Sequence, residues 1–559
     1  MSPLPAAQRR LLAAALAWGF VLSLWLSRVF FLHPPEWVPL THEGNSYAGR
    51  LLEFRDLLAA GYPSPQWATH FRQGLGSPFF SYYQPGLFYL ASLVPGSPAP
   101  VRALGAAVVL LAWLGYSATL LLVRRWFGAL SGVLAASLLL LSVYACTEIY
   151  VRGDLSEFAG MMLLPVGLWA LASWLEEGRL SRLVLLSAAA ATLAVTHPAM
   201  GLLGYALLGM LAVALLPTPR RHRAAQALLA LVFGVGLAAF YWMPLLLEWE
   251  LVAAERAFAG FYEYAGHFIR PAELLGRYTR DTAVPFSLGP ILPALVATNA
   301  LVLLMRRREL SHVQAAAAAL GFAALAVTGF LMTQASALLW AKLPLLALIQ
   351  FPWRLLALVT VLAASLAGAM LPWRREGLRC VALACLVGAA LLSSRDWSAY
   401  APDPELRNPR DAAELESVDF SPDAMGEWMP RDASKVPDQR LATLPTASSG
   451  ASVEGFERSQ GHLRAHVKAE RSGSVVLPHY AFPVGWTATL AGAPIEIGTS
   501  PRGLMRFELP AGSDAELEVS FSMTPMRKAG IWISGLTLVG GGLLLLAGIL
   551  SASRQAPLD

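Results

Sequence analysis

The sequence predicts an α-helical polytopic membrane protein with a β-rich domain placed before its last helix. Hydrophobic residues make up 56% of the 559 residues and charged residues only 14%, whereas a soluble domain usually carries about 25% charged residues. Apolar runs recur along the chain, and a bilayer core requires about 20 such residues per helix. They predict about 12 transmembrane helices, near residues 11–32, 101–123, 128–147, 158–175, 183–197, 199–216, 225–246, 287–305, 313–333, 353–372, 379–394 and 529–551.

Arginine clusters between the apolar runs predict the orientation of these helices. With twelve helices the clusters fall on one side, which the positive-inside rule makes the cytoplasm. Both termini are then cytoplasmic, and the loops 33–100 and 248–286 are periplasmic in a bacterial inner membrane. Because the clusters are short and set by topology, the net charge of +5 does not indicate nucleic-acid binding. The clusters include Arg9-Arg10, Arg124-Arg125, Arg220-Arg221, Arg306-Arg307-Arg308 and Arg374-Arg375.

The chain divides into a transmembrane part at 1–394, a periplasmic domain at 395–526 and a final helix with a cytoplasmic tail at 527–559. Alternating segments such as Glu516-Leu-Glu-Val-Ser-Phe, separated by Gly- and Pro-containing turns, predict a small β-sandwich-like domain. We expect this domain to stabilise or dock rather than to react.

The loop 33–100 is long and rich in His, Glu, Arg, Trp and Tyr, which favours a binding or reacting role. Glu43, preceded by His42, lies just beyond the first helix, where a carboxylate can act as a general base or hold a divalent metal. Arg50 can orient this acid or bind a phosphate. The alternative is a solvated loop acid. For Glu53 we expect an exposed helix face.

Aromatic and basic residues continue along this loop. Trp67, Arg72, Tyr82 and Tyr83 combine ring surfaces with hydrogen-bonding groups that can bind sugar or lipid. Such aromatic residues are equally typical of the belt at a membrane interface.

A second periplasmic turn carries Arg152, Asp154 and Glu157 within six residues. Charges at helix ends cost little when they reach the interface, whereas a charge at the bilayer centre costs about 2.5–3.5 kcal/mol. These side chains either pair with one another or lie opposite Glu43. In the second case, Arg152 binds phosphate and the two acids contact the acceptor. We expect His197 to be a hydrogen-bonded structural residue.

Two later residues complete the predicted site. His267 lies in the loop 248–286, which is long enough to cover a cavity. Arg354 opens a helix after Gln350-Phe-Pro-Trp, where it can hold a lipid phosphate bidentately or serve as an interfacial anchor.

Several common motifs are absent from the sequence. It has no Gly-x-x-x-x-Gly-Lys loop, no Gly-x-Ser-x-Gly turn and no His-Glu-x-x-His pair, so ATP-driven pumping and serine or zinc hydrolysis have no support. Cys146, Cys380 and Cys385 lie in or beside apolar segments, which excludes a disulfide within 395–526 and a cysteine-based zinc site. We assign no metal ligands.

The first loop resembles that of the GT-C membrane glycosyltransferases. It is still more similar to a bacterial membrane family labelled 6-pyruvoyl-tetrahydropterin synthase-related, and to the related YfhO-like membrane proteins. The resemblance covers nearly the whole chain, through motifs that are each loose. They are Thr41-His-Glu-Gly, Gly61-Tyr-Pro-Ser-Pro-Gln-Trp, Gly76-Ser-Pro-Phe-Phe-Ser-Tyr-Tyr-Gln-Pro-Gly-Leu, Tyr150-Val-Arg-Gly-Asp-Leu-Ser-Glu, Thr196-His-Pro, Gln350-Phe-Pro-Trp-Arg and Gly485-Trp.

The resemblance implies a GT-C-like fold and transfer of a sugar from a polyprenyl phosphate, such as undecaprenyl phosphate, to a glycan, lipid or protein acceptor. It implies an inverting reaction with Glu43 as the base, and phosphate contacts from Arg72, Arg152 or Arg354. Membrane lipids are further partners, no cofactor is certain, and a divalent cation is an open alternative. Two departures stand out, because GT-C enzymes usually place Asp where Glu43 lies, and Gln84 replaces a lysine of the aminoarabinose transferases.

A non-catalytic transporter or scaffold for polysaccharide or lipid intermediates is the alternative function. A transporter is expected to carry broken helices and paired charges near the bilayer midplane. In this sequence the ionisable residues gather at the predicted periplasmic ends of the helices. That distribution favours chemistry at the membrane interface over alternating access.

Overall fold

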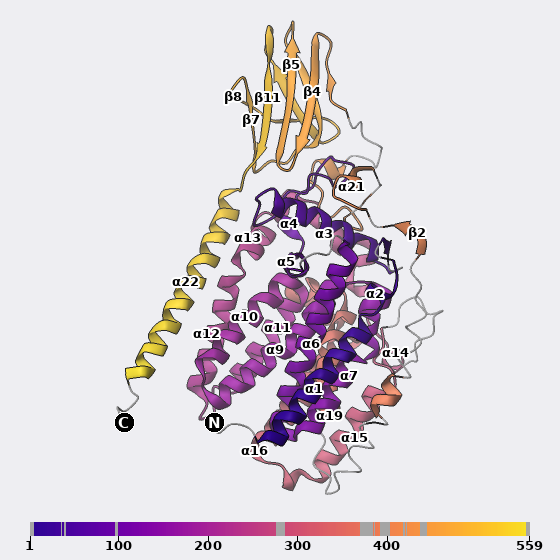
Figure 1. Ribbon diagram of the computed structural model, residues 1–559, viewed down its shortest axis with the longest axis vertical. Coiled ribbons are helices and arrows are strands. Elements are labelled where there is room, and N and C mark those ends of the chain that lie inside the picture. The colour runs from indigo at the N-terminus through magenta and orange to yellow at the C-terminus, as the bar shows by residue number, and fades with distance from the viewer. Residues whose placement is uncertain are drawn as a thin grey trace.

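The computed structural model describes residues 5–554 except 35, 39–40, 95–98, 276–285, 369–383, 385, 392–402, 408, 418–419, 421 and 436–443. A bundle of helices lies below a β-rich domain, and α22 runs along the outside of the bundle (Figure 1). The helices are α1 (Ala6–Leu26), α2 (Val29–Leu32), α3 (Gly44–Ala59), α4 (Phe79–Tyr82), α5 (Gly86–Ser92), α6 (Pro100–Phe127), α7 (Ala129–Leu140), α8 (Val143–Thr147), α9 (Leu155–Glu177), α10 (Leu180–Thr196), α11 (Pro198–Val213), α12 (Arg221–Leu237), α13 (Ala239–Leu247), α14 (Pro271–Leu274), α15 (Ile291–Met305), α16 (His312–Leu331), α17 (Ala337–Lys342), α18 (Pro344–Ala347), α19 (Leu356–Gly368), α21 (Glu414–Ser417) and α22 (Pro525–Arg554).

Among the described residues, five helical segments are long and apolar enough to cross a membrane, including α6, α9 and α16. A sixth is obtained if α12 and α13, which meet at 69°, count as one segment. Four more apolar helices are shorter, α10 and α11 among them. The predicted count of twelve is therefore not confirmed. Parts of the segments predicted at 353–372 and 379–394 lie outside the described residues, as do Cys380 and Cys385.

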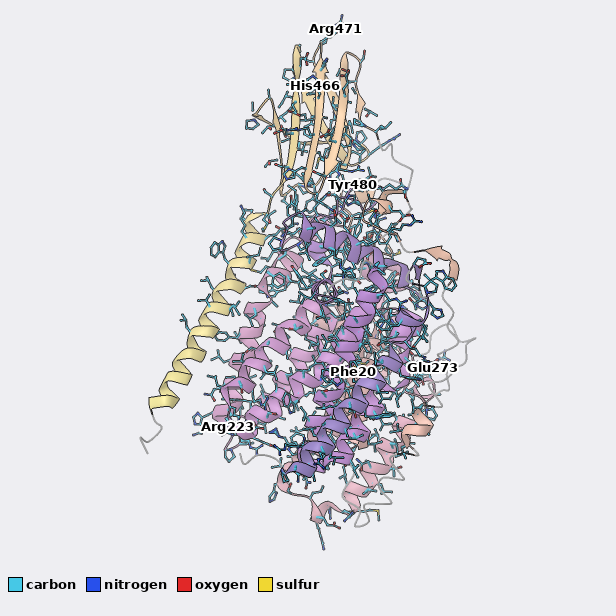
Figure 2. The ribbon with its side chains drawn as sticks, in the orientation of Figure 1. Phe20, Arg223, Glu273, His466, Arg471 and Tyr480 are labelled. Carbon is cyan, nitrogen blue, oxygen red and sulfur yellow. The ribbon has the colours of Figure 1, made fainter. Side chains whose placement is uncertain are left out.

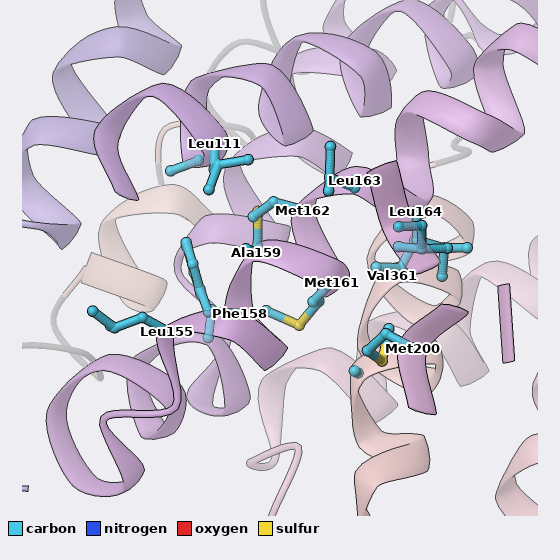
Figure 3. Close-up of a cluster of buried hydrophobic side chains, with 14 of the residues drawn as sticks. Leu111, Leu155, Phe158, Ala159, Met161, Met162, Leu163, Leu164, Met200 and Val361 are labelled. Atoms are coloured by element: carbon cyan, nitrogen blue, oxygen red, sulfur yellow. The ribbon is translucent and has the colours of Figure 1, made fainter. Parts of the chain in front are cut away.

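Helix α9 forms the centre of the bundle. It is apolar on nearly all sides, which is typical of a helix that lies in a protein core or spans a membrane, and almost all of its residues are buried by other parts of the chain. Figure 3 shows Met161 and Leu164 of α9 among side chains from other helices, including Met200 of α11 and Val361 of α19. Gly160 permits this packing, since a Cβ there would lie 2.7 Å from the Met200 Cβ.

Two antiparallel sheets form the β-rich domain. Along β5, Leu463, Ala465 and Val467 are buried between the sheets, while the alternating residues face outward. Figure 2 shows His466 and Arg471 on the part far from the helices and Tyr480 near its base. One sheet has the order β3 (Thr446–Ala447), β6 (Gly473–Tyr480), β10 (Leu504–Leu509), β9 (Gly498–Thr499), and the other β4 (Ala451–Ser459), β5 (His462–Ala469), β11 (Ser513–Phe521), β7 (Trp486–Leu490), β8 (Ala493–Ile495).

The sheets begin at Thr446, well after the predicted domain boundary at 395. Strand β2 (Asp403–Arg407) pairs instead with β1 (Trp37–Val38) of the first loop. The described residues between 403 and 435 thus lie against the loops of the helical part. The segment also contacts the sandwich, because Glu416 pairs with Arg458 of β4 and Ala433 packs in the core of the β-rich domain.

Glu53 is fully buried where α3 meets the β-rich domain, so the predicted exposed face of α3 is wrong at this position. Its carboxylate accepts hydrogen bonds from His70 Nδ1 at 2.7 Å and from Gln460 Nε2 at 3.0 Å. Gln460 also donates to Asp56 at 2.9 Å, and Glu416 lies 3.9 Å from His70 Nε2. The domain covers this face of α3, and the buried carboxylate is satisfied by groups from both sides of the contact.

This cluster predicts a pH-dependent stability. Burial opposes protonation of His70, but the hydrogen bond and charge of Glu53 outweigh it and raise the pKa of the histidine. The resulting stabilisation is present below the unfolded pKa of about 6.5 and is lost as pH rises through the higher folded pKa. Relative to His70→Gln, the wild type is expected to gain about 1.5–3 kcal/mol at low pH, the range for hydrogen bonds to charged groups.

Thermal unfolding of both proteins between pH 5.5 and 9 measures this difference. His466→Gln is the control, because His466 contacts Asp514 at 2.7 Å on the outer sheet face and such exposed pairs contribute less than about 1 kcal/mol. A wild-type advantage that grows as pH rises would contradict the prediction.

Candidate active site

The first loop meets the second turn through its backbone. The amides of His42 and Glu43 donate to the carbonyls of Val151 and Arg152, both at 3.0 Å. Val151 and Arg152 end a π-helical turn, η1 (Glu148–Arg152), that precedes α9. Turns of π-helix are rare in proteins, and those that occur are often found at functional sites. This contact brings together two segments that lie more than one hundred residues apart in sequence.

Arg152 is the centre of a buried ionic network. Its guanidinium lies 2.6 Å from Glu148, 3.0 Å from Asp154 and 2.9 Å from Glu157, and it covers the ring of Trp353 at 4.5 Å. Buried charges persist only when they are paired and hydrogen-bonded. Arg152 therefore pairs with Asp154 and Glu157, which is one of the two arrangements that the sequence allowed. The paired side chains lie beside Glu43.

Sequence reasoning missed Glu148. It lies four residues before Arg152 on a helical segment, and this spacing places two side chains on one face. The spacing was therefore a usable signal. The carboxylate is fully buried, and both of its oxygens accept from Arg152, at 2.7 and 2.6 Å.

Asp154 joins the network to the first loop. It caps α9 by accepting from the backbone amide of Glu157 at 3.0 Å, and it accepts from the Tyr47 hydroxyl of α3 at 2.9 Å. Burial would raise its pKa, but the charge of Arg152 and its other neighbours hold the pKa of Asp154 well below its ordinary value. A carboxylate with a lowered pKa and this many partners positions its neighbours and is poorly suited to accept a proton.

Arg354 approaches the same carboxylates from the 3₁₀ turn Pro352–Leu355, which precedes α19. Its Nε donates to Glu157 at 3.1 Å, and its Nη1 donates to Gln350 at 2.7 Å. Glu157 also accepts from Tyr144 at 2.5 Å and lies 3.9 Å from His197 Nε2. His197 caps α11 by accepting from the amide of Met200 at 3.2 Å, which agrees with its expected structural role.

Glu43 forms the accessible edge of this arrangement. Its Oε2 accepts from Arg50 at 3.1 Å, and its side chain is 35% exposed, whereas that of Arg50 is 5% exposed. Arg50 also donates to Tyr83 at 2.7 Å, and Tyr83 lies 3.2 Å from Tyr47, which continues to Asp154. One continuous chain of hydrogen bonds therefore links Glu43 to the network.

Exposure distinguishes Glu43 from Glu148, Asp154 and Glu157, which are all buried. Burial and the charge of Asp154 raise the pKa of Glu43 above its ordinary value, against the opposing effects of Arg50 and Arg152. Four carboxyl groups face three guanidinium groups in the assembled cluster of Glu43, Arg50, Glu148, Arg152, Asp154, Glu157 and Arg354. Glu43 is thus the acid of this cluster best placed to accept and release a proton.

A segment from the C-terminal half of the chain covers this site, and no motif in the sequence pointed to it. The Pro422 carbonyl accepts from Arg50 Nε at 2.8 Å, and Asp423 pairs with Arg72. Trp428 stacks on Tyr82, with ring centroids 5.7 Å apart. We name residues 422–430 the strap. On its other side it contacts the third loop, where the amide of Ala253 donates to the carbonyl of Met429 at 3.1 Å.

The strap also contributes a carboxylate that sequence reasoning missed. Burial and the charge of Asp423 raise the pKa of Glu427 to about 7. Its Oε2 accepts from the amide of Met425 at 3.0 Å. Arg50 and Tyr262 interact electrostatically with Glu427. The strap therefore places a second titratable acid near the Arg50 side of the site.

The structure does not place every predicted residue in this network. Trp67 is 1% exposed and packs between Phe482 and Trp486 of the β-rich domain, so its predicted stacking on a sugar is corrected to a core role. Tyr82 is also 1% exposed and donates to the carbonyl of Glu248 at 2.9 Å, which makes it structural as well.

Three predicted residues occupy other positions around the site. His42 lies beside Glu43, and partial burial of its imidazole together with the charge of Arg152 lowers its pKa. His267 packs edge-on against Phe351 at 4.6 Å, next to the segment that carries Arg354. Arg72 adopts a positive φ of 57° and is held by Asp423 of the strap.

Asp154, Glu157 and His197 could supply metal ligands. One ligand atom from each lies within 4.8 Å of the others, and all three residues are buried. The carboxylates already accept hydrogen bonds from Arg152 and Arg354. A divalent ion would have to compete with two guanidinium groups for these oxygens.

The family comparison is decisive for the identity of the chain. The family model described as "6-pyruvoyl-tetrahydropterin synthase related domain; membrane protein" matches residues 80–401, more than half of the sequence. The chain belongs to this membrane-protein family. The matched range contains Arg152, Asp154, Glu157 and Arg354, whereas Glu43 and Arg50 lie before it. A comparison with curated proteins finds no match.

Solved structures give weaker similarities. The arabinofuranosyltransferase AftD from Mycobacteria is 19% identical with a TM-score of 0.37, and the alignment covers 71% of this chain and 27% of that one. The oligosaccharyltransferase AglB from Archaeoglobus fulgidus, in complex with an inhibitory peptide and a dolichol-phosphate, is 15% identical with a TM-score of 0.42, covering 72% and 57%. The chain thus spans about a quarter and just over half of these enzymes. At these scores their chemistry cannot be transferred to this chain.

Proposed function

We propose that this chain is a membrane glycosyltransferase that moves a sugar from a polyprenyl-phosphate donor to a glycan, lipid or protein acceptor. The observation that carries the proposal is the position of Glu43. This partly exposed carboxylate is held by Arg50 beside a buried network that contains Arg152 and Arg354. A proton acceptor next to cations is the arrangement that transfer from a phosphate leaving group requires.

In the proposed reaction, Glu43 removes the proton from an acceptor hydroxyl. The oxygen attacks the anomeric carbon from the face opposite the phosphate, and the bond between this carbon and the phosphate oxygen breaks. The configuration inverts, and the polyprenyl phosphate departs with the electron pair. Because this phosphate is already a competent leaving group, the step requires neither a nucleotide nor an obligatory metal.

Among the three arginines predicted to contact phosphate, the geometry favours Arg354. Its side chain is 14% exposed, compared with 8% for Arg152, which three carboxylates surround. Arg72 is 17% exposed but is held by Asp423. Arg354 shares Glu157 with Arg152 in the network, and its hydrogen bonds with Glu157, Ile349 and Gln350 use only Nε and Nη1. Its Nη2 is therefore the group that we expect to contact a lipid phosphate.

A non-catalytic scaffold or transporter for polysaccharide or lipid intermediates is the second candidate. The ion pairs and hydrogen bond among Arg152, Asp154 and Glu157 favour this candidate, because these charges are paired without a ligand. A network of this kind can serve only to fix the fold, because many proteins keep an architecture without its reaction.

The test is transfer by the purified protein. Labelled polyprenyl-phosphate sugars are incubated with the protein and a membrane extract, and transfer of label to extract material is expected. Binding of undecaprenyl phosphate is measured in parallel. Binding without transfer would favour the scaffold, and absence of both would contradict the glycosyltransferase proposal.

We expect transfer to persist when EDTA removes divalent cations. Arg152 and Arg354 already neutralise the carboxylates of Asp154 and Glu157 that a metal would use, and the leaving group needs no Lewis acid. Rates measured with EDTA, and after addition of Mg²⁺ or Mn²⁺, should agree within about twofold, well below the tenfold that 1.4 kcal/mol represents. Loss of transfer with EDTA and its recovery with Mn²⁺ would assign a metal to Asp154, Glu157 and His197.

A further inference from the structure

A cavity of about 190 Å³ opens among the helices, remote from the ionic network. Its lining includes Leu171 of α9, Leu207 of α11, and Ala317 and Gly321 of α16. The small side chains of α16 leave this space open. An apolar cavity of about 150 Å³ in another protein accommodates benzene, so this one has room for part of a hydrocarbon chain.

The cavity lies near the end of the bundle away from the β-rich domain. Figure 2 shows Arg223 at this end, which the sequence predicts to be cytoplasmic. Glu176 of α9 lines the cavity. Along this helix it lies about 28 Å from the network residue Glu157, at a rise of 1.5 Å per residue. A ligand here would therefore not contact the proposed active site.

The charges around the cavity are distributed unevenly. Glu176 is engaged by Arg125, at 2.8 Å, and by the indole of Trp126, at 2.7 Å. Arg223 donates to the carbonyls of Leu175 and Glu176, at 2.9 and 2.7 Å, and so caps α9. Arg220 lines the cavity and is half-buried, and its side chain has no ion pair with any residue that the structure describes.

We propose that this cavity binds one acyl chain of an anionic phospholipid whose phosphate pairs with Arg220. The cavity lies among α6, α9 and α16, which are long and apolar enough to cross a membrane, so hydrocarbon chains surround it. A guanidinium at its edge selects for a phosphate, which it can bind bidentately. Zwitterionic lipids offer the same chains but carry an ammonium group that Arg220 repels.

Native mass spectrometry of the full-length protein in detergent tests this site with phosphatidylglycerol and phosphatidylethanolamine as probes. The wild type should retain one phosphatidylglycerol molecule about fivefold more strongly than phosphatidylethanolamine, the ratio that corresponds to about 1 kcal/mol. Arg220→Gln should remove this preference. Arg221→Gln is the matched control, because Arg221 is an exposed neighbour that does not line the cavity, and it should leave the preference intact.

A second pair of variants tests the acyl-chain contact. Ala317→Trp should block the cavity and reduce retention of both lipids, whereas Ala319→Trp, at an exposed position of α16 outside the cavity, should not. Equal retention of both lipids by the wild type would overturn the proposal. So would equal effects of Arg220→Gln and Arg221→Gln, or displacement of phosphatidylglycerol by undecaprenyl phosphate, which would assign the cavity to the donor tail.

Discussion

Glu43→Gln is expected to reduce sugar transfer by about 10²–10⁴-fold, the usual contribution of a general base, while leaving the fold intact. Glutamine keeps an oxygen that can accept from Arg50, so the contact at 3.1 Å can persist. It cannot remove a proton from an acceptor hydroxyl. Transfer rates and thermal unfolding of the same preparations separate these two effects.

Two further variants sharpen this prediction. Glu43→Asp keeps a carboxylate and is expected to retain more transfer than Glu43→Gln, although its shorter side chain weakens the contact with Arg50. Glu36→Gln alters an exposed acid of the same loop and should leave the rate unchanged. If Glu43→Gln transfers sugar as fast as Glu36→Gln, Glu43 is not the base.

The rate should also depend on pH in a direction set by Glu43. Its pKa is raised by burial and by Asp154, and the base must be deprotonated to act. Transfer by the wild type should therefore decline as pH falls through a value above the ordinary glutamate pKa of about 4.3. The residual transfer of Glu43→Gln should lack this decline.

The sequence was informative where chemistry is local. Arg152, Asp154 and Glu157 lie within six residues, and their proximity in the structure follows from that spacing. Apolar runs located most helices, but they could not predict the 69° bend between α12 and α13, which divides one run into two helices. The shorter apolar runs, including those of α10 and α11, were likewise predicted as complete transmembrane helices.

Other parts of the site depend on contacts between distant segments. The amides of His42 and Glu43 bond to the carbonyls of Val151 and Arg152, and backbone groups carry no sequence pattern. The Pro422 carbonyl, which accepts a hydrogen bond from Arg50, is likewise a backbone group that no sequence pattern marks. Trp67 was misread because stacking on a sugar and packing in a core use the same ring, and only the arrangement of the β-rich domain separates them.

Arg152→Met is expected to reduce the free energy of unfolding by about 3–5 kcal/mol, the cost of removing one partner from a buried ion pair. Methionine retains much of the apolar packing against Trp353 but leaves Glu148, Asp154 and Glu157 without their shared cation. Arg464→Met is the matched control, because Arg464 is 55% exposed and contacts Glu516 and Glu518 on the outer sheet face. Exposed pairs of this kind contribute about 0–1 kcal/mol.

A double variant distinguishes uncompensated charge from lost packing. Because the cost arises from carboxylates that remain buried, adding Glu148→Gln to Arg152→Met should recover part of the lost stability, although it removes a further native side chain. If the loss came from packing, the second substitution would lower stability again. Thermal unfolding of the single and double variants in the same detergent decides between these outcomes, and a melting temperature of Arg152→Met equal to that of Arg464→Met would contradict the central role of Arg152.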